Sequence, residues 1–315
     1  MNPGRRRGLL LGALMLLLVG LGFLAKFLFP LEIYEFTQRT RMYWAGAHAF
    51  ESAGIKGFER DFCEGTTETC SCIALIHGLG DDAYTWSRLL SQARAPLGPW
   101  KSNVRLVAVH LPETEGSGPS ANGRYGPRDL ADALKTALAP VCRRWVVVGN
   151  SLGGWIALWM ALDWPEGVER LVLLAPAGLR SKRDEATKMA LGLLDPTSDL
   201  LKEFQKRAYA KPADLPDSVF RAVAKRLRSR PVRKTLEAIK DSDFIDDKLA
   251  LVRAPAIVLA GLSDQIVPPT SVEALAKGLP IASFQKIEAC GHMPQKECTP
   301  VVIKAIEQSL AYGSF

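Results

Sequence analysis

The chain of 315 residues contains no internal repeat, no low-complexity segment, no CxxC pair and no histidine–cysteine spacing typical of a zinc site. The absence of repeats and biased segments excludes a fibrous or disordered protein, and the missing spacings leave no candidate metal site. The chain does have 48% hydrophobic residues and ordinary glycine and proline usage. This composition predicts one large globular domain with a sizeable core.

Cysteine usage is modest and does not identify a redox compartment. Six cysteines are compatible with an oxidising compartment but do not require one, because lone buried cysteines are common core residues. The stretch CEGTTETC predicts a hairpin that brings Cys63 opposite Cys70, and Cys290 lies close in sequence to Cys298. We therefore expect one or two disulfides at most.

The amino terminus differs from the rest of the chain. Three arginines, Arg5 to Arg7, precede an uncharged apolar run from Gly8 to Ala25. This run is close to the minimum of about 18 residues for a membrane-spanning helix. No small-residue cleavage site follows Ala25, which favours an uncleaved anchor over a signal peptide. The arginines predict a single span near Gly8 to Phe29 with a cytoplasmic amino terminus and the catalytic domain across the membrane, at the periplasmic face in a bacterium.

Beyond this segment, short apolar runs alternate with helical patterns. Helices are expected after Tyr84, Pro127, Leu152 and Thr270. The runs predicted as strands are Ile73 to Ile76, Val104 to Val109, Trp145 to Val148, Leu171 to Leu174 and Ala256 to Ala260. Continuous apolar strands separated by helices predict an α/β fold with a mostly parallel sheet covered on both faces. Ligands of such sheets lie at the carboxyl ends of the strands.

The stretch VVVGNSLGGW places a serine between glycines where a strand passes directly into a helix. Gly149, Ser151 and Gly153 form the G-x-S-x-G pattern of a nucleophile elbow, in which small neighbours permit a sharp turn that exposes the serine hydroxyl. A purely structural alternative is that Ser151 only caps the following helix. The strand-to-helix context favours the nucleophile.

Histidine is scarce, and this makes the search for a catalytic base strict. A serine nucleophile of this kind requires a base that follows it in the chain order serine, acid, histidine. His48, His77 and His110 precede Ser151, so only His292, in EACGHMPQKE, occupies the required position. We predict His292 as the base; otherwise it is a surface loop histidine.

The acid should lie on a loop at a strand end between the serine and the histidine. Asp264 follows the strand glycine Gly261 in AIVLAGLSDQIVPP and could hold the His292 imidazole in the correct tautomer. A turn-forming aspartate is the structural alternative. Asp184, in the charged helical segment SKRDEATK, is the poorer candidate.

The stretch ALIHGLGDD leads from a strand into a glycine-rich loop. A backbone N–H from such a loop, together with the N–H that follows the nucleophile, forms an oxyanion hole. We assign these donors to Leu79 and Leu152, and we expect His77 to brace the loop. A glycine-rich turn without a catalytic role is the alternative. This mechanism needs neither a metal nor an organic cofactor.

The motifs HGLG, GNSLGG, GLSDQIVP and GHMPQKE, in this order, resemble those of the α/β-hydrolase family over about residues 55 to 312. The resemblance implies a mostly parallel eight-stranded sheet flanked by helices, with a helical cap inserted before the acid. More narrowly, the apolar amino terminus, LVLLAPAGLRS and the insertion look like membrane-anchored monoacylglycerol lipases. One departure is VAVHLPETEGSG, where His110 replaces an aspartate that relatives usually carry.

This resemblance divides the chain into four parts. We expect a membrane anchor over 1–30, a juxtamembrane helical segment over 31–54, a hydrolase core over 55–178 and 251–315, and a helical cap over 179–250. Apolar cap residues could line an acyl tunnel: Met189, Leu191, Leu193, Leu194 and Leu201.

The expected activity is hydrolysis of carboxylic esters of single-chain lipids, such as monoacylglycerol or lysophospholipid. The stretch Arg221 to Lys234 contains no acidic residue, and the net charge is +7. Basic cap residues near a bilayer could contact anionic headgroups, whereas no nucleic-acid-binding module is present. Two alternatives remain: a hydrolase of soluble esters or carbon–carbon bonds, and a catalytically silent membrane scaffold.

Overall fold

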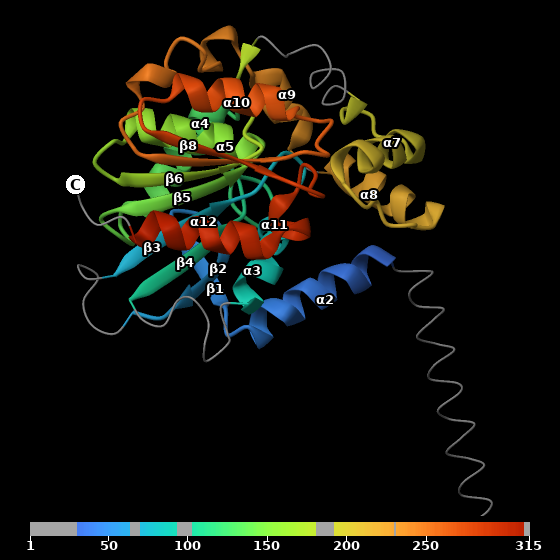
Figure 1. The fold of residues 1–315 in the computed structure, drawn as a ribbon. Helices are drawn as coiled ribbons and strands as arrows, with labels where there is room; N and C mark the ends of the chain where they lie inside the picture. The colour runs from blue at the N-terminus through green and yellow to red at the C-terminus, as the bar shows by residue number, and fades with distance from the viewer. Residues whose placement is uncertain (1–29, 64–69, 93–102, 181–191, 230, 312–315) are drawn as a thin grey trace, which may run out of the picture.

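The computed structural model describes residues 30–63, 70–92, 103–180, 192–229 and 231–311. Its centre is an eight-stranded sheet with the strand order β1-β2-β4-β3-β5-β6-β7-β8 (Figure 1). The strands are β1 (His48–Ser52), β2 (Ile55–Asp61), β3 (Ser71–Ile76), β4 (Val104–Val109), β5 (Trp145–Asn150), β6 (Val168–Leu174), β7 (Ala256–Gly261) and β8 (Ala282–Ile287). The pairs β1–β2 and β2–β4 are antiparallel, and the remaining pairs are parallel. The predicted mostly parallel sheet of eight strands is thereby confirmed.

Helices cover both faces of the sheet (Figure 1). They are α2 (Pro30–Trp44), α3 (Ser87–Gln92), α4 (Pro127–Leu138), α5 (Leu152–Asp163), α7 (Ser198–Ala208), α8 (Asp217–Ser229), α9 (Val232–Ala238), α10 (Pro269–Gly278), α11 (Pro294–Glu297) and α12 (Thr299–Ala311). Short 3-10 turns are η1 (Ala83–Trp86), η3 (Asp241–Asp243) and η4 (Leu249–Leu251). Helical structure therefore follows each of the four sites named from the sequence.

The central strands are mostly apolar because each one packs into two separate cores. In β3, Cys72, Ala74 and Ile76 join the core beneath α4, α5 and α10, whereas Ile73 and Leu75 join the core beneath α3 and α12. Side chains of a strand alternate between its two faces, so a strand covered on both sides needs apolar residues at every position. This burial fixes the strand ends, and with them the loops that carry the site.

The sequence did not predict the hairpin β1–β2 that forms one edge of the sheet. Its strands HAFES and IKGFERD contain several exposed residues and no continuous apolar run. Helix α2 precedes the hairpin, so the segment 31–54 is helical only as far as Trp44 and then enters a strand. Edge strands bury fewer side chains than central strands, which weakens their pattern in the sequence.

The membrane topology predicted from the sequence requires correction. The predicted span, Gly8 to Phe29, lies outside the described residues. Within the part of the chain that the structure describes, no helix is long and apolar enough to cross a bilayer. The predicted single-pass topology, and the periplasmic location drawn from it, are therefore not supported.

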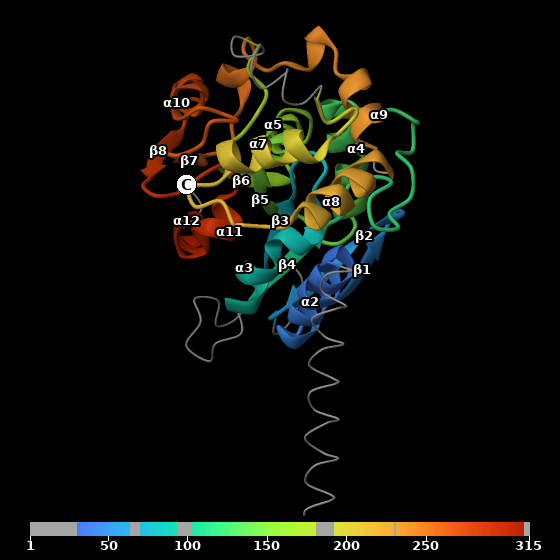
Figure 2. The ribbon, with the colours of Figure 1, turned by 90° about the vertical axis from the view of Figure 1, so that its right-hand side faces the viewer.

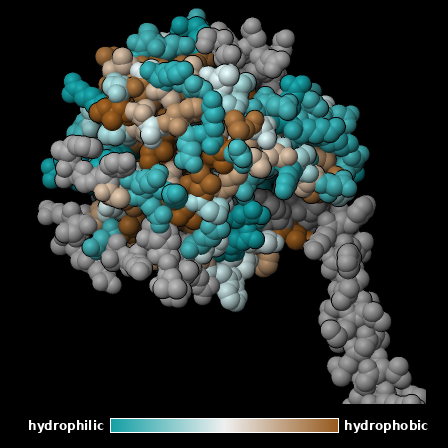
Figure 3. Space-filling view, in the orientation of Figure 1, coloured by the Kyte–Doolittle hydropathy of each residue, from teal (hydrophilic) through white to brown (hydrophobic). Residues whose placement is uncertain are grey.

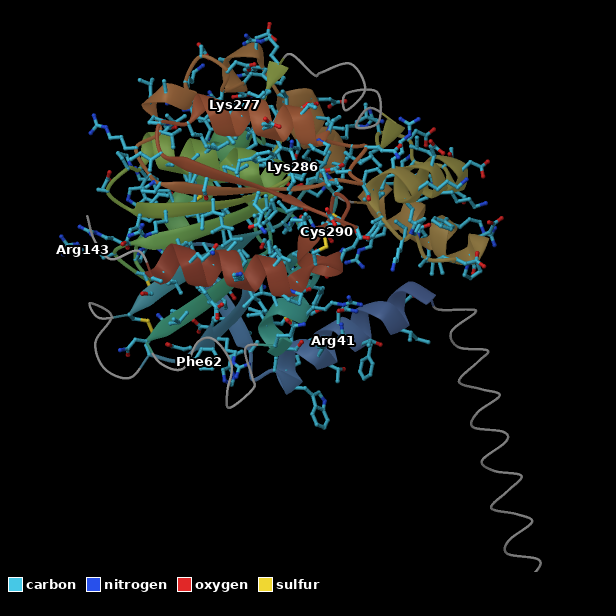
Figure 4. The ribbon with its side chains drawn as sticks, viewed as in Figure 1. Arg41, Phe62, Arg143, Lys277, Lys286 and Cys290 are labelled. Atoms are coloured by element: carbon cyan, nitrogen blue, oxygen red, sulfur yellow. A yellow bond between two sulfur atoms is a disulfide. The ribbon has the colours of Figure 1, made fainter. Side chains whose placement is uncertain are left out.

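All six cysteines are paired, as Cys63–Cys70, Cys72–Cys142 and Cys290–Cys298. Figure 4 shows the sulfur of Cys290 beside α11. The expectation of one or two disulfides at most was too low. The pair that lacks a local indication in the sequence joins β3 to the segment after α4, across 70 residues, and only the parallel sheet brings these two positions together.

Candidate functional site

Ser151 lies at a sharp turn between β5 and α5. Its backbone has φ 54° and ψ −117°, a conformation that L-residues rarely adopt. Neighbouring glycines permit the turn: a Cβ on Gly149 would lie 2.2 Å from the carbonyl oxygen of Gly153, and one on Gly153 would lie 2.3 Å from that of Ile76. Such strain costs about 1–3 kcal/mol and is typical of active sites. The local geometry is that of a nucleophile elbow.

Two loops at neighbouring strand ends bring the predicted acid and base together. Asp264 follows β7, His292 follows β8, and each is only 3% exposed. Asp264 Oδ2 lies 2.8 Å from His292 Nδ1, while its Oδ1 accepts hydrogen bonds from the backbone N–H groups of Ile266 and Val267. Because an ionised carboxylate can only accept, Nδ1 carries the hydrogen of this bond. In the neutral imidazole, the other ring nitrogen, Nε2, then carries no hydrogen and can accept one.

Ser151 and His292 both line one cavity, together with Leu79 and Leu152. The backbone N–H groups of these two leucines donate to no other group among the residues that the structure describes. Leu152 is the first residue of α5, so its N–H is also one of the groups that a helix leaves unpaired. Both N–H groups are thus available to an anionic oxygen beside Ser151.

A buried amide network, absent from the sequence predictions, ties the base loop to the elbow. Asn150 is fully buried, and its Nδ2 donates to the carbonyl oxygens of Leu174 (3.0 Å) and His292 (2.9 Å). Gln295 Nε2 donates to Asn150 Oδ1 at 3.1 Å. The network fixes the backbone of His292 relative to the residue before Ser151. The sequence offered one signal of this network: Asn150 is a polar residue at the end of a strand that begins with a run of valines.

The remaining buried histidines have structural partners. His77 Nδ1 lies 2.8 Å from the carbonyl oxygen of Gly78, and its Nε2 accepts from the N–H of Leu111 at 3.1 Å, which confirms the predicted bracing of the glycine-rich loop. His110, at the departure from the family pattern, accepts from the N–H of Ala83 at 3.2 Å and packs edge-on against Tyr84. Its contacts hold the start of η1.

The cavity has a volume of about 1240 Å³ and lies between the strand ends and the helices α7, α8 and α9, hereafter the cap helices. Its apolar lining includes Leu179, Leu193, Leu201, Phe204, Phe220, Val223, Leu227, Leu236, Ile239, Phe244 and Ile266. Leu193 and Leu201 were predicted to line an acyl tunnel; Leu194 does not line the cavity, and Met189 and Leu191 lie outside the described residues. Hydrophilic residues dominate the visible outer side of α7 and α8 (Figure 3). These helices therefore present apolar side chains to the cavity and polar ones to solvent.

Tyr84, on η1, contributes a polar group to the cavity wall. Burial, with a smaller contribution from the nearby Glu115 carboxylate, raises the pKa of Tyr84 to about 12. The phenol therefore remains protonated at neutral pH and can donate a hydrogen bond.

Ion pairs join the cap helices to core loops. Arg226 Nη2, on α8, lies 3.0 Å from Asp82 Oδ2 and 2.6 Å from Glu115 Oε1. Lys234 Nζ, on α9, lies 2.6 Å from Glu113 Oε2, and this hydrogen bond, followed by one from Tyr125, lowers the pKa of Glu113. Part of the basic stretch Arg221 to Lys234 is thus used within the molecule.

Comparison with known proteins defines the class. Residues 73–305 match the alpha/beta hydrolase family, and the chain belongs to it. Among curated relatives, a 2-hydroxy-6-oxononadienedioate/2-hydroxy-6-oxononatrienedioate hydrolase from Paraburkholderia phymatum is 30% identical over 240 residues, 71% of this chain and 82% of the relative. A pimeloyl-[acyl-carrier protein] methyl ester esterase from Aromatoleum aromaticum is 28% identical, over 70% of this chain and 91% of the relative.

Solved structures of low sequence identity share the fold. A membrane phospholipase A, described as a bacterial virulence factor, superposes with a TM-score of 0.71 at 22% identity and covers 96% of this chain and 98% of its own. The carboxylesterase CesB from Bacillus subtilis gives 0.69 at 19% identity, over 90% and 99% of the two chains. The chain is therefore a hydrolase of the alpha/beta class, with esterase, lipase and carbon–carbon hydrolase neighbours.

Proposed function

We propose that the protein is a serine hydrolase that cleaves carboxylic esters of acyl chains, with Ser151 as nucleophile, His292 as base and Asp264 as the residue that orients it. The observation that carries this proposal is the buried contact of 2.8 Å between His292 Nδ1 and Asp264 Oδ2, at the wall of the cavity that Ser151 also lines. No scaffold role requires this arrangement.

In the proposed reaction, Ser151 Oγ attacks the acyl carbonyl carbon and gives its proton to His292 Nε2. The oxyanion that forms accepts hydrogen bonds from the N–H groups of Leu79 and Leu152. When the carbon–oxygen bond breaks, the leaving alcohol takes the proton from His292. A water molecule, deprotonated by His292, then attacks the acyl-enzyme and releases the carboxylic acid.

The cavity supports an acyl substrate. Its volume of about 1240 Å³ exceeds the 300–1,000 Å³ range of common ligand pockets, and most of its cap-side lining is aliphatic or aromatic. Burying methylene groups there contributes about 0.8 kcal/mol each. Single-chain esters such as monoacylglycerol or lysophospholipid match a lining of this kind.

Cleavage of a carbon–carbon bond is the second candidate, and the curated relatives favour it. Five relatives of 25–30% identity, over 71–76% of this chain, are named 2-hydroxy-6-oxononadienedioate/2-hydroxy-6-oxononatrienedioate hydrolases. The same serine could attack a ketone carbonyl and expel a carbon leaving group. The two candidates share their nucleophile and differ in their substrate.

A substrate panel separates the candidates. The purified protein is assayed with p-nitrophenyl butyrate and octanoate, a monoacylglycerol, a lysophospholipid, a triacylglycerol and a 2-hydroxy-6-oxodienoate. Turnover of acyl esters supports the proposal, and turnover of the dienoate alone establishes the second candidate.

Variants test the nucleophile directly. Ser151→Ala and His292→Ala should each lower kcat by several orders of magnitude, and the double variant should lose little more, because the residues act as a unit. Ser271→Ala is the matched control, since Ser271 lines the same cavity away from the elbow. Fluorophosphonate labelling should disappear in Ser151→Ala and persist in Ser271→Ala; retained labelling of Ser151→Ala would remove the proposed nucleophile.

A further inference from the structure

One wall of the cavity comes from helix α2, which precedes the residues that match the family. The match begins at residue 73, whereas α2 spans Pro30–Trp44. This helix packs against α3 and α8, and Figure 2 shows it beside α3 and below α8. Gln38 and Arg41 of α2 line the cavity that contains Ser151. This wall of the candidate site thus lies outside residues 73–305, the part of the chain that matches the family.

A buried glutamine orients Arg41. Gln38 is 8% exposed, and its Oε1 accepts hydrogen bonds from Ser87 Oγ and, at 3.4 Å, from Arg41 Nη1. Figure 4 shows Arg41 on α2. Because the glutamine is held by α3, the guanidinium of Arg41 is positioned relative to the core and not by α2 alone.

Two more cations lie along the same part of the cavity wall. Arg88 follows Ser87 on α3, and its Nη1 donates to the carbonyl oxygen of Lys296 at 2.8 Å. Lys296, on α11, has its Nζ 3.3 Å from Asp81 Oδ2. Arg88 and Lys296 both line the cavity. Three helices thus bring positive groups to one side of it.

The acidic residues of the lining do not balance these charges. The lining cations are Arg41, Arg88, Lys211, Arg226 and Lys296, and the lining carboxylates are Asp81, Asp82 and Glu297. Two carboxylates pair with cations, Asp81 with Lys296 and Asp82 with Arg226. The third, on Glu297, accepts from the backbone N–H groups of Gly291 and Ala210.

This pairing leaves Arg41, Arg88 and Lys211 without a partner among the lining carboxylates. Of these, Arg41 and Arg88 lie on the neighbouring helices α2 and α3, whereas Lys211 follows α7. Within the described ranges of the chain, no carboxylate lies within ion-pair distance of either guanidinium. A guanidinium presents paired N–H donors that match the oxygens of a carboxylate or phosphate. An anionic group in the cavity would therefore find two guanidinium groups that no carboxylate of the described residues neutralises.

We propose that Arg41 and Arg88 bind an anionic group of the substrate, a carboxylate or a phosphate, while the ester bond lies at Ser151. This inference rests on the proposed function and narrows it to acyl esters that carry a negative charge. The two arginines determine specificity and take no part in bond cleavage.

Calorimetry on Ser151→Ala protein tests the anion site without turnover. Monomethyl decanedioate is compared with its dimethyl ester, and decyl phosphate with decanol. We expect at least one anionic ligand to bind tenfold or more tightly than its neutral partner, and the larger preference identifies carboxylate or phosphate. Equal binding within both pairs would overturn the proposal.

Charge-removing variants locate the site. In the Ser151→Ala protein, Arg41→Gln and Arg88→Gln together should reduce the preference for the anionic over the neutral ligand to within twofold. The affinity for the neutral ligands should stay unchanged. Arg124→Gln together with Arg143→Gln, at exposed arginines outside the cavity, removes the same two charges and should keep the preference. Arg41→Lys with Arg88→Lys, which keeps the charge, provides a second test if the glutamine variants fold poorly and should restore part of the preference. A preference that survives the double glutamine variant contradicts the assignment.

The proposed hydrolase activity and the proposed anion site are tested independently of each other. If protein with Ser151 intact hydrolyses no ester, the hydrolase proposal is contradicted, and the calorimetric comparison still decides whether Arg41 and Arg88 form an anion site.

Discussion

Asp264→Asn should inactivate the protein through the tautomer of His292. Asp264 Oδ1 is held by two backbone N–H groups, those of Ile266 at 2.8 Å and Val267 at 3.0 Å. An asparagine must place its carbonyl oxygen there, because the reverse orientation would direct an amide NH₂ at two N–H donors. Its NH₂ then faces His292 Nδ1, which has to accept a hydrogen bond. The ring proton moves to Nε2, where the nitrogen can no longer accept the proton of Ser151.

The expected decrease in kcat reflects the loss of the His292 base alone, because asparagine has nearly the same shape as aspartate and keeps the packing. The same tautomer effect in a serine protease triad lowers kcat by about 10⁴, which corresponds to about 5 kcal/mol in the activation barrier. Steady-state hydrolysis of p-nitrophenyl octanoate measures the change. Asp163→Asn, at an exposed carboxylate that pairs with Arg128, is the control and should keep full activity. A kcat of Asp264→Asn within tenfold of the parent would refute the reasoning.

Three further predictions concern stability. Gly153→Ala should lower the free energy of unfolding by about 3 kcal/mol, measured by urea denaturation, because its Cβ would lie 2.3 Å from the Ile76 carbonyl oxygen; an unchanged midpoint contradicts this. Arg226→Gln should lower the free energy of unfolding by about 2 kcal/mol, because it removes charge-assisted hydrogen bonds to the carboxylates of Asp82 and Glu115. Loss of activity with an unchanged free energy of unfolding would argue against this prediction. Glu113→Gln should unfold at lower urea than the parent at pH 7, and the difference should shrink as the pH falls below the ordinary glutamate pKa. The lowered pKa of Glu113 means that its stabilisation is present above the ordinary glutamate pKa and lost as pH falls through the lowered one; a difference that grows in acid has the wrong sign.

The sequence predicted the strands that bury the most apolar side chains. The strand runs between Ile73 and Ala260 are apolar at every position except Arg105 because both faces are covered, so their pattern is strong. The contact between Asp264 and His292 was predictable because scarcity left one candidate base, and the position of Asp264 on a loop after a strand favoured it over Asp184 as the acid. The residues follow neighbouring strands, and parallel strands end at one edge of the sheet.

The sequence patterns did not predict contacts between residues that lie far apart in the chain. The Cys72–Cys142 disulfide joins positions 70 residues apart, and nothing near either cysteine indicates the other. The cavity wall formed by α2 has the same origin, since Arg41 lines the cavity because α2 packs against α3 and α8. Pairings of this kind depend on how distant elements pack, which local patterns do not encode.

The loop between β4 and α4 shows how such pairings can also offset strain. Glu113 and Glu115 have φ values of 58° and 50°, which cost about 1 kcal/mol or more each in residues other than glycine. Their carboxylates meet Lys234 and Arg226 of the cap helices, so the strained backbone is stabilised by ion pairs with the elements that cover the cavity. The conformation of this loop and the position of the cap helices are therefore coupled, because moving either one removes the contacts that stabilise the other. Replacing a glutamate in this loop consequently acts on the roof of the cavity as well as on the loop, although neither glutamate lines the cavity.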